Sequence, residues 1–294
     1  MSYVINSAAQ GTPEWLAARA GRITGSMAHM ARKVGMLTDQ QAKYVAAIKA
    51  GADEKAAMLA AGYRAKPRAE AIEKALAGML VGDWGEESKK YAFKLAVERI
   101  SGECIESGFG GSFYTKRGHL AEAECRMVYE LRMDCLITET GFMCTDDGKF
   151  GVSPDGLIDE DEGWECKGYT DPAKLMPVLL GNDFTGFRDQ CLMGLWLTGR
   201  RRWTQALYLP ALNCIGRDLS SFTIDRKDEG VEDEITQLET DLLALDALVE
   251  SYRARLLEGA TPADLGIPAE VPAEQPVTVA ARPVAPDAIA SMTF

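Results

Sequence analysis

The chain has 294 residues, of which 47% are hydrophobic and 26% are charged, and its formal net charge is −12. This length and composition are typical of a globular protein with a sizeable core, and no stretch approaches the roughly 20 apolar residues that a membrane helix needs. The acidic charge argues against a protein that coats nucleic acid, because phosphate binding normally needs a basic surface, but it does not exclude a basic groove on an acidic body.

Residues 1–36 are predicted to form a short segment that leads into a helix. Thr12 followed by Pro13 and Glu14 is typical of an N-terminal cap, and the helical sequence WLAARAGRI comes next. The start of this segment, MSYVINSAAQGTPEW, has neither the basic nor the apolar region of a signal peptide. We therefore expect a cytoplasmic protein.

An alanine-rich insert follows at 37–84. Glycine and proline residues interrupt its helical periodicity, which predicts three short helices at about 38–49, 53–61 and 66–80. Each helix is too short to be stable alone, so we expect the three to pack together as a small module.

Two amphipathic helices are predicted next, at about 86–100 and 115–132. From 134 to 169 the pattern changes to strands separated by Asp-Gly turns. The sequence DQCLMGLWLTG predicts another helix, and RRWTQALYLP and DLSSFTIDR predict two further strands.

A long charged helix over 229–258 ends the part that is predicted to be ordered. We expect its apolar stripe to pack on its own domain rather than to form a coiled coil. The tail at 259–294 is rich in proline, alanine and valine from Thr261 onward, which predicts disorder.

Cysteines and histidines limit the metal chemistry. The seven cysteines are scattered and form no CxxC pair, so we expect reduced, mostly buried thiols, without a disulfide framework or a zinc site. Only two histidines are present, His29 and His119. A metal would therefore be held by oxygen ligands, which favours magnesium or manganese.

Six carboxylates crowd into SPDGLIDEDEGWECKGY, residues 153–169. Side chains alternate between the two faces of a strand. Glu165 and Lys167 should therefore point the same way, while Trp164 and Cys166 face the core.

Asp155 stands in the turn before the preceding strand and lies beside Glu165 if the two strands pair as a hairpin. The other acids would then form its exposed tip: Asp159, Glu160, Asp161 and Glu162. Two converging carboxylates repel unless a cation compensates them. A divalent metal there would lower the pKa of a bound water, and Lys167 would position or activate this water for attack on phosphorus. The alternative is a surface hairpin in which Lys167 only pairs with Glu165, because the P-D-x(n)-E-x-K pattern with free spacing is moderately specific.

Several separated blocks make the pattern more specific. They are W-L-A-A-R-A-G-R-I-T-G-S (15–26), R-G-H-L-A-E-A-E (117–124), S-P-D-G-L (153–157), E-C-K (165–167) and Q-C-L-M-G-L-W-L-T-G (190–199). In this order they resemble the lambda-type phage exonuclease family, a branch of the PD-(D/E)xK nuclease superfamily, along most of the chain outside the insert. The resemblance implies an α/β fold with a restriction-endonuclease-like core, a mixed central β-sheet flanked by helices. This core would comprise 1–36 and 85–228, with the helix over 229–258 packed on it.

The resemblance also implies roles for single positions. Lys167 would be the catalytic lysine. The metal ligands would be Asp155, Glu165, Glu122 and the backbone carbonyl of Cys166. Gln190 matches the first glutamine of the family's Q-x-Q motif, whereas Leu192 leaves the second glutamine unfilled.

A pocket for a 5′-terminal phosphate is implied by the match of Arg19, Ser26 and Ser153. A guanidinium and two hydroxyls suit a phosphate dianion. Without the resemblance, Arg19 is typical of an arginine on a helix surface. For His119, which is near Glu122 in the sequence, a structural role fits better than metal contact.

The resemblance thus implies a phage or prophage alkaline exonuclease. Such an enzyme degrades one strand of duplex DNA from its 5′ end by two-metal hydrolysis with Mg²⁺, for which Mn²⁺ should substitute. It releases 5′-phosphomononucleotides and leaves 3′ single-stranded overhangs for recombination. It also implies a homotrimer, a single-strand annealing protein as a partner, and no membrane association.

Two alternatives stay open. One is another activity on the same fold, such as an endonuclease or a Cas4-like nuclease, although the latter should carry a cysteine quartet for an iron-sulfur cluster. The other is a non-catalytic DNA-binding or packaging protein, against which the intact D-x(9)-E-x-K pattern argues.

The insert resembles the helix-turn-helix module of phage small terminase subunits, through T-x-x-Q-x-x-Y at its start and AAMLAAGY further on. A modest basic face follows: Arg64, Lys66, Arg68 and Lys74. DNA binding and a packing or oligomer-contact role both stay open for it. Arg200 and Arg201 are likewise candidates for phosphate contacts, or residues that complement the end of a helix.

Overall fold

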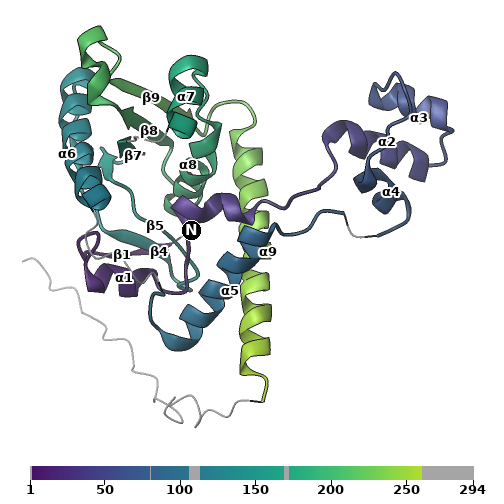
Figure 1. The fold of residues 1–294 in the computed structure, drawn as a ribbon, viewed down its shortest axis with the longest axis horizontal. Helices are drawn as coiled ribbons and strands as arrows, with labels where there is room; N and C mark the ends of the chain where they lie inside the picture. The colour runs from purple at the N-terminus through teal and green to yellow at the C-terminus, as the bar shows by residue number, and fades with distance from the viewer. Residues whose placement is uncertain (1, 80, 106–112, 169–171, 260–294) are drawn as a thin grey trace, which may run out of the picture. The chain divides into compact units, whose positions relative to one another are not determined.

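The computed structural model describes residues 2–79, 81–105, 113–168 and 172–259, without the side chains of 113–120 and Pro172. The chain divides into two compact units, Met1–Leu256 and Leu257–Phe294, and only three residues of the second unit are described. In the first unit, helices alternate with strands that form two mixed sheets (Figure 1). The predicted α/β class with mixed pairing is confirmed, and the predicted disordered tail lies outside the described residues.

The larger sheet has five strands and carries the acidic motif. Its order is β3 (Ile137–Thr138), β6 (Gly156–Ile158), β7 (Glu162–Gly168), β8 (Arg202–Tyr208) and β9 (Leu219–Asp225). The pair β7–β8 runs parallel and the other pairs run antiparallel. A parallel pair needs a long crossover, which α7 (Pro172–Gly181) and α8 (Thr185–Thr198) supply.

The smaller sheet has four strands and leads directly into the larger one. Its order is β1 (Tyr3–Asn6), β4 (Phe142–Thr145), β5 (Phe150–Val152) and β2 (Ile23–Thr24). β2 runs parallel to β5, and the other pairs are antiparallel. Only Ser153, Pro154 and Asp155 separate β5 from β6. The link between the two sheets therefore carries the first half of the acidic motif.

Helices cover both faces of the larger sheet (Figure 1). On one face, Tyr129 of α6 (Phe113–Met133) packs against Trp164 of β7, with ring centroids 5.7 Å apart. On the other face, α8 approaches β8 closely at Gly194. A Cβ atom there would lie 2.4 Å from the ring of Trp203, so only glycine permits this approach.

The helices α5 (Glu86–Ser101) and α9 (Val231–Leu257) complete the main core. The apolar stripe of α9 is buried in one cluster with side chains of α5, α8 and β5: Val231, Ile235, Leu238, Leu242, Leu245 and Val249. Phe93 of α5 meets Tyr252 of α9 edge to face, with ring centroids 6.3 Å apart. The stripe thus packs within the chain that carries it.

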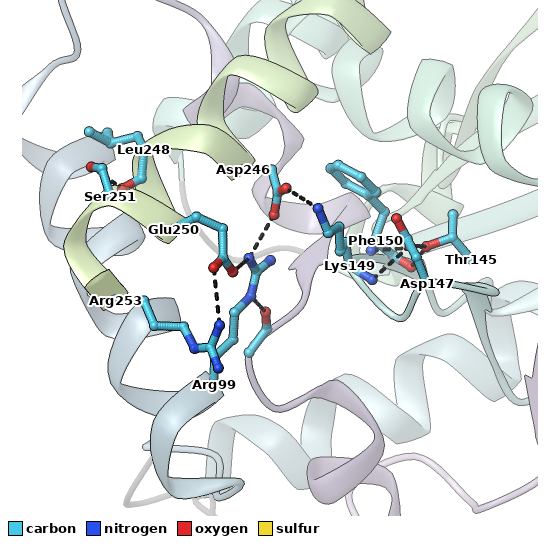
Figure 2. Close-up of polar contacts among 11 residues, drawn as sticks. Arg99, Thr145, Asp147, Lys149, Phe150, Asp246, Leu248, Glu250, Ser251 and Arg253 are labelled. Atoms are coloured by element: carbon cyan, nitrogen blue, oxygen red, sulfur yellow. Dashed lines mark hydrogen bonds and ion pairs between the residues drawn. The ribbon is translucent and has the colours of Figure 1, made fainter. Parts of the chain in front are cut away.

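Charged side chains join α5, α9 and the turn between β4 and β5 (Figure 2). Arg99 Nη1 of α5 lies 2.7 Å from Asp246 Oδ1 and 2.7 Å from Glu250 Oε1, both on α9. Lys149 Nζ, just before β5, lies 2.8 Å from Asp246 Oδ2. Only 7% of the Asp246 side chain is exposed, and a carboxylate buried so deeply needs such partners because desolvation of an unpaired charge is costly.

The insert folds into the three expected helices, α2 (Asp39–Lys49), α3 (Glu54–Ala61) and α4 (Glu70–Leu76). A capping box between Thr38 and Gln41 starts α2. The three helices share a hydrophobic core of their own: Tyr44, Val45, Ala57, Ala61, Ile72 and Ala75. Burial of these side chains offsets the weakness of each short helix.

The helix α4, the last of the insert, begins later than the sequence predicts. Pro67 holds the residue before it in an extended conformation, and Ala69 provides no side-chain cap. At the base of the insert, Val34 and Asp83 exchange two backbone hydrogen bonds of 2.9 and 3.0 Å. The insert therefore leaves and rejoins the core at neighbouring residues.

Five elements are absent from the sequence prediction: the strands β1 and β2, the helix α7, and the two 3-10 helices η1 (Gly25–Ala31) and η2 (Pro210–Ile215). Pro177 lies inside α7, and an internal proline is normally evidence against a helix.

The prediction for α1 (Pro13–Arg19) is confirmed, because Thr12 Oγ1 accepts the capping hydrogen bond at 3.2 Å. Within the described ranges, no helix is long and apolar enough to cross a membrane.

Candidate active site

The acidic motif forms the predicted hairpin between β6 and β7. Gly156 pairs with Trp164, and Ile158 pairs with Glu162. Asp155 immediately precedes β6. The pairing therefore brings the start of β6 next to the second half of β7, where the motif's glutamate and lysine lie.

Lys167 lies between the two carboxylates of the motif. Its Nζ is 3.6 Å from Asp155 Oδ2 and 3.6 Å from Glu165 Oε2. Alternation along β7 places Glu165 and Lys167 on one face, whereas Trp164 and Cys166 are fully buried on the other. Two acids and one amine thus converge on one point.

The carboxylate of Glu165 is almost completely buried, with 2% of the side chain exposed. Gln190 Nε2 donates a hydrogen bond of 2.6 Å to its Oε2, and the Cys166 N–H donates one of 2.8 Å to Asp155 Oδ2. Burial, and next the charge of Asp155, raise the pKa of Glu165 to about 8, although Lys167 and Gln190 oppose this effect. The single ammonium does not compensate both carboxylates, so the site favours a further cation or a proton.

These side chains line a hollow of about 230 Å³. Eight residues named from the sequence border it: Arg19, Ser26, Glu122, Ser153, Asp155, Glu165, Lys167 and Gln190. They come from α1, η1, α6, the link between the sheets, β7 and α8. The fold therefore gathers in one place the blocks that are widely separated in the sequence.

Trp15 holds the side chains on the α1 side of the hollow. Its Nε1–H donates to Ser153 Oγ at 3.1 Å, and Gln10 Nε2 donates to the same oxygen at 3.1 Å. The Arg19 guanidinium lies over the Trp15 ring, 4.2 Å from its centroid, in a cation–π contact. Sequence reasoning overlooks both Trp15 and Gln10, although the tryptophan of W-x-x-x-R was an available signal.

Gln205 is another residue that sequence reasoning misses. It is aligned with Glu165 in the parallel register of β7 and β8, and it is fully buried. Its Nε2 donates to the Glu165 carbonyl at 3.4 Å and to the Ala206 carbonyl at 3.0 Å. Gln205 therefore supports the strand backbone that carries Glu165, and only the pairing of distant strands reveals this.

Cys166 is joined to Cys125 of α6 by a disulfide, with Cα atoms 6.8 Å apart. The prediction of reduced thiols is therefore wrong for this pair. The two residues are 41 positions apart, so their spacing gives no indication that α6 packs directly on β7. The link ties the helix that carries Glu122 to the strand that carries Glu165.

Asp155 and Glu165 offer two hard oxygen donors for a metal, and Glu122 lines the same hollow. In the part of the chain that the structure describes, no three His, Cys, Asp or Glu side chains are close enough to form a complete metal cage. Mg²⁺ normally keeps several waters and binds through one or two carboxylates together with substrate phosphates. The donor set therefore fits Mg²⁺ or Mn²⁺, while the roles of Glu122 and the Cys166 carbonyl as ligands stay predictions.

Glu162 does not lie at the exposed tip of the hairpin, contrary to the sequence prediction. It is the first residue of β7 and is 7% exposed. Thr204 Oγ1 donates to its Oε1 at 2.6 Å, and Arg202 Nε lies 3.0 Å from its Oε2. The hairpin turn is shorter than expected, so only 159–161 form the tip.

Arg200 and Arg201 lie far from the hollow. The start of β8 is level with Glu162 at the start of β7, five residues or roughly 16 Å from Lys167 along the strand. Arg200 Nη1 donates to backbone carbonyls of the hairpin, and Arg201 Nη2 pairs with Asp225 at 2.8 Å. The structure does not bring these arginines to the candidate site.

The basic residues of the insert also lie apart from the hollow. Arg64, Lys66 and Arg68 lie in the loop between α3 and α4, and Lys66 Nζ pairs with Glu54 at 2.6 Å. None of the three lines the hollow. Their contact with DNA stays a prediction.

A comparison with protein-family models matches residues 14–201 to the YqaJ-like viral recombinase domain. The match covers more than half of the chain and includes every residue that lines the hollow except Gln10. No curated protein sequence matches the chain.

Solved structures with a similar fold include the alkaline exonuclease LHK-Exo from Laribacter hongkongensis. It is 19% identical, with a TM-score of 0.57, and the similarity covers 85% of this chain and 98% of that chain. LHK-Exo in complex with dAMP gives 21% identity and a TM-score of 0.55 over the same shares of the two chains. A phage-related exonuclease from Haemophilus somnus 129PT is 12% identical, with a TM-score of 0.44 and coverage of 80% and 100%. At these identities the first two show a shared fold, and the third is too distant to support an argument.

Proposed function

Because the chain belongs to the YqaJ-like viral recombinase domain family, we propose that it degrades one strand of duplex DNA from the 5′ end, with Mg²⁺, and releases 5′-phosphomononucleotides. Family membership confirms the exonuclease family inferred from the sequence, and nucleases of this type use divalent metal ions. The observation that carries the proposal is the convergence of Asp155, Glu165 and Lys167 in the hollow that Arg19 also lines.

Arg19, Ser26 and Ser153 would hold the terminal phosphate. The guanidinium is planar and permanently charged, so it can donate two parallel hydrogen bonds to a phosphate. Trp15 restricts both Arg19, through the ring contact, and Ser153, through its hydrogen bond. A preorganised pocket of this kind would place the first phosphodiester bond of the strand at the acidic motif.

At the reacting bond, Lys167 would orient the attacking water, because its ammonium lies between the two carboxylates. The hydrogen bond from Gln190 fixes the orientation of Glu165. Mg²⁺ held by Asp155 and Glu165, with Glu122 at a second metal, would polarise the phosphodiester and lower the pKa of water.

The 3′ overhangs left by this reaction would serve phage recombination in the bacterial cytoplasm. By the same resemblance to lambda-type exonucleases, the proposed assembly is a homotrimer on a DNA end, and the proposed partner is a single-strand annealing protein. LHK-Exo, which shares the fold, has been solved in complex with dAMP, and a bound deoxymononucleotide agrees with mononucleotide products.

The proposal is tested with linear duplexes that carry either a 5′-phosphate or a 5′-hydroxyl, incubated with Mg²⁺. Lys167→Ala should lower the rate of mononucleotide release by about 10²-fold or more, because a positioned proton-transfer group contributes about that much. Lys227→Ala, an exposed lysine after β9, is the matched control and should match wild type. Equal rates for wild type and Lys167→Ala would refute the mechanism.

Arg19→Ala tests the polarity of the reaction. Wild type should prefer the 5′-phosphorylated duplex, and the variant should lose this preference while it retains slow cleavage. Chromatography of the products distinguishes mononucleotides from the longer fragments of an endonuclease. If wild type treats the two ends alike, Arg19 does not bind a terminal phosphate.

A further inference from the structure

A second hollow of about 620 Å³ adjoins the candidate active site. The two hollows share Gln10, Glu122 and Asp155. The second one extends from these residues between α6 and the segment that follows β1, where Ala9 and Ala123 line it. A molecule that is bound at the acidic motif can therefore continue into the second hollow past Asp155.

The volumes of the two hollows indicate which part of a substrate would enter the second hollow. The first hollow, at about 230 Å³, is smaller than the ≈ 300–1,000 Å³ typical of sites for small organic ligands. It suits a terminal phosphate, the reacting phosphodiester and a cation, and has no further room for a base. The second hollow lies within the typical range, so it has room for a sugar and a purine.

The charges of the lining residues indicate whether the second hollow binds the DNA backbone or a sugar and base. Three carboxylates line the second hollow, those of Glu122, Glu139 and Asp155. Arg126 also lines it, but its guanidinium is paired with Glu139. With Glu122 and Asp155 on the proposed metals and Arg126 paired with Glu139, the lining offers no spare positive charge for the phosphodiester backbone of the strand that follows. An uncharged sugar and base need no such charge.

We propose that the second hollow receives the sugar and base of the 5′-terminal nucleotide, which is the nucleotide that each cleavage releases. This inference rests on the proposed exonuclease function. Ala9 and Ala123 line the hollow with small side chains, so larger side chains at these positions would leave less room for a purine than for a pyrimidine.

The double variant Ala9→Leu/Ala123→Leu, which makes the second hollow smaller, tests the inference. Both alanines are exposed at its wall, and leucine keeps the helix propensity of α6 close to that of alanine. The control is Ala247→Leu/Ala254→Leu, which makes the same changes at exposed positions of α9. Thermal unfolding of all three proteins checks that they fold.

Three 5′-phosphorylated duplexes differ only in the terminal nucleotide, which carries a purine, a pyrimidine or no base (tetrahydrofuran). Single-turnover release of the first nucleotide is measured with Mg²⁺. The double variant should slow release of the purine nucleotide by about tenfold or more, because even one added methylene in a pocket discriminates by about that order and each Ala→Leu change adds three carbon atoms. The pyrimidine nucleotide should be slowed less, and the baseless one should leave within about twofold of the wild-type rate.

Equal slowing of all three substrates would overturn the inference, because the hollow would then hold the following backbone or affect only the fold. No slowing of any substrate would overturn it too. If the double variant does not fold, Ala123→Leu alone should give the same order of substrates with a smaller effect, and a different order counts against the inference. Failure of wild type to release mononucleotides from any duplex would instead refute the proposed function.

Discussion

The buried carboxylate of Glu165 makes the metal-free protein sensitive to pH. Its pKa rises from an ordinary value of 4.5 to about 8 on folding, chiefly because the carboxyl group is buried. Between these two values the folded protein holds a proton that the unfolded chain has lost. The stabilisation from this proton is therefore fully present below pH 4.5 and is lost as the pH rises through 8.

Glu165→Gln should remove this dependence, because a neutral amide imitates the protonated carboxyl group. In a chelating buffer, we expect the unfolding temperature of wild type to fall relative to that of Glu165→Gln between pH 6 and pH 9. Thermal unfolding across this range measures the difference. Glu160→Gln, at the exposed hairpin tip, should follow wild type at every pH. Parallel curves for wild type and Glu165→Gln would contradict the buried, raised-pKa state of Glu165.

Single residues also show which features of the site can be predicted from the sequence. Strand alternation is a local property, and it placed Glu165 and Lys167 on one face correctly. The burial of Glu162 depends on where the hairpin turns, and a run of four acids does not mark that position. Gln205 acquires its role through a partner strand 40 residues away. Contacts of this kind are set by tertiary packing and leave no pattern in the nearby sequence.

At the scale of elements, α5 holds the turn between α1 and β2 through one glycine. Gly21 has a φ of +70°. Its N–H donates to Glu98 Oε2 at 2.8 Å, and its carbonyl accepts from Arg99 Nε at 2.8 Å. This turn separates Arg19 from Ser26 in the sequence. The ion pairs of Arg99 with α9 (Figure 2) therefore connect the long helix to the proposed phosphate pocket.

Arg99→Leu should destabilise the protein by about 1.5–3 kcal/mol, because it removes one of the two cations, Arg99 and Lys149, that pair with the buried Asp246 carboxylate. Arg253→Leu is the matched control. Its ion pair with Glu250 lies on a side chain that is 42% exposed, and such pairs contribute at most about 1 kcal/mol. Urea unfolding measures both. Equal destabilisation in the two variants would show that the ion pairs of Arg99 contribute no more to stability than the exposed ion pair of Arg253.

Individual elements also differ in how well the sequence predicts them. The insert helices have strong local signals, such as the capping box at Thr38 and the glycine that ends α3. The helix α7 has a contrary signal, Pro177 in its interior, and its buried Val178 packs in a cluster that includes Leu207 of β8, far away in the sequence. The disulfide between Cys125 and Cys166 likewise depends on the packing of α6 against β7.

At the scale of the whole molecule, the insert is a separately packed part of the chain. It has its own hydrophobic core. It is joined to the rest at Val34 and Asp83, which exchange backbone hydrogen bonds as an antiparallel pair. A pair of this kind is readily closed by a two-residue Asn-Gly turn.

Replacement of residues 35–82 by Asn-Gly should therefore leave the candidate active site intact. We expect the shortened protein to release mononucleotides at a saturating rate within a few-fold of wild type. If the insert binds duplex DNA through Arg64, Lys66 and Arg68, the shortened protein should show a higher KM. The slope of log KM against log salt should also fall by about one for each phosphate that the insert neutralises in the full chain, because each neutralised phosphate releases counterions.

The triple variant Arg64→Ala/Lys66→Ala/Arg68→Ala, in the full chain, separates DNA binding from packing. It should reproduce the change in salt slope without a change in unfolding temperature, because these side chains lie in a loop outside the core of the insert. A salt slope equal to that of wild type in both proteins would exclude phosphate binding by the insert. The insert would then act through packing or contact between subunits, and a change in oligomeric state after its removal would show which.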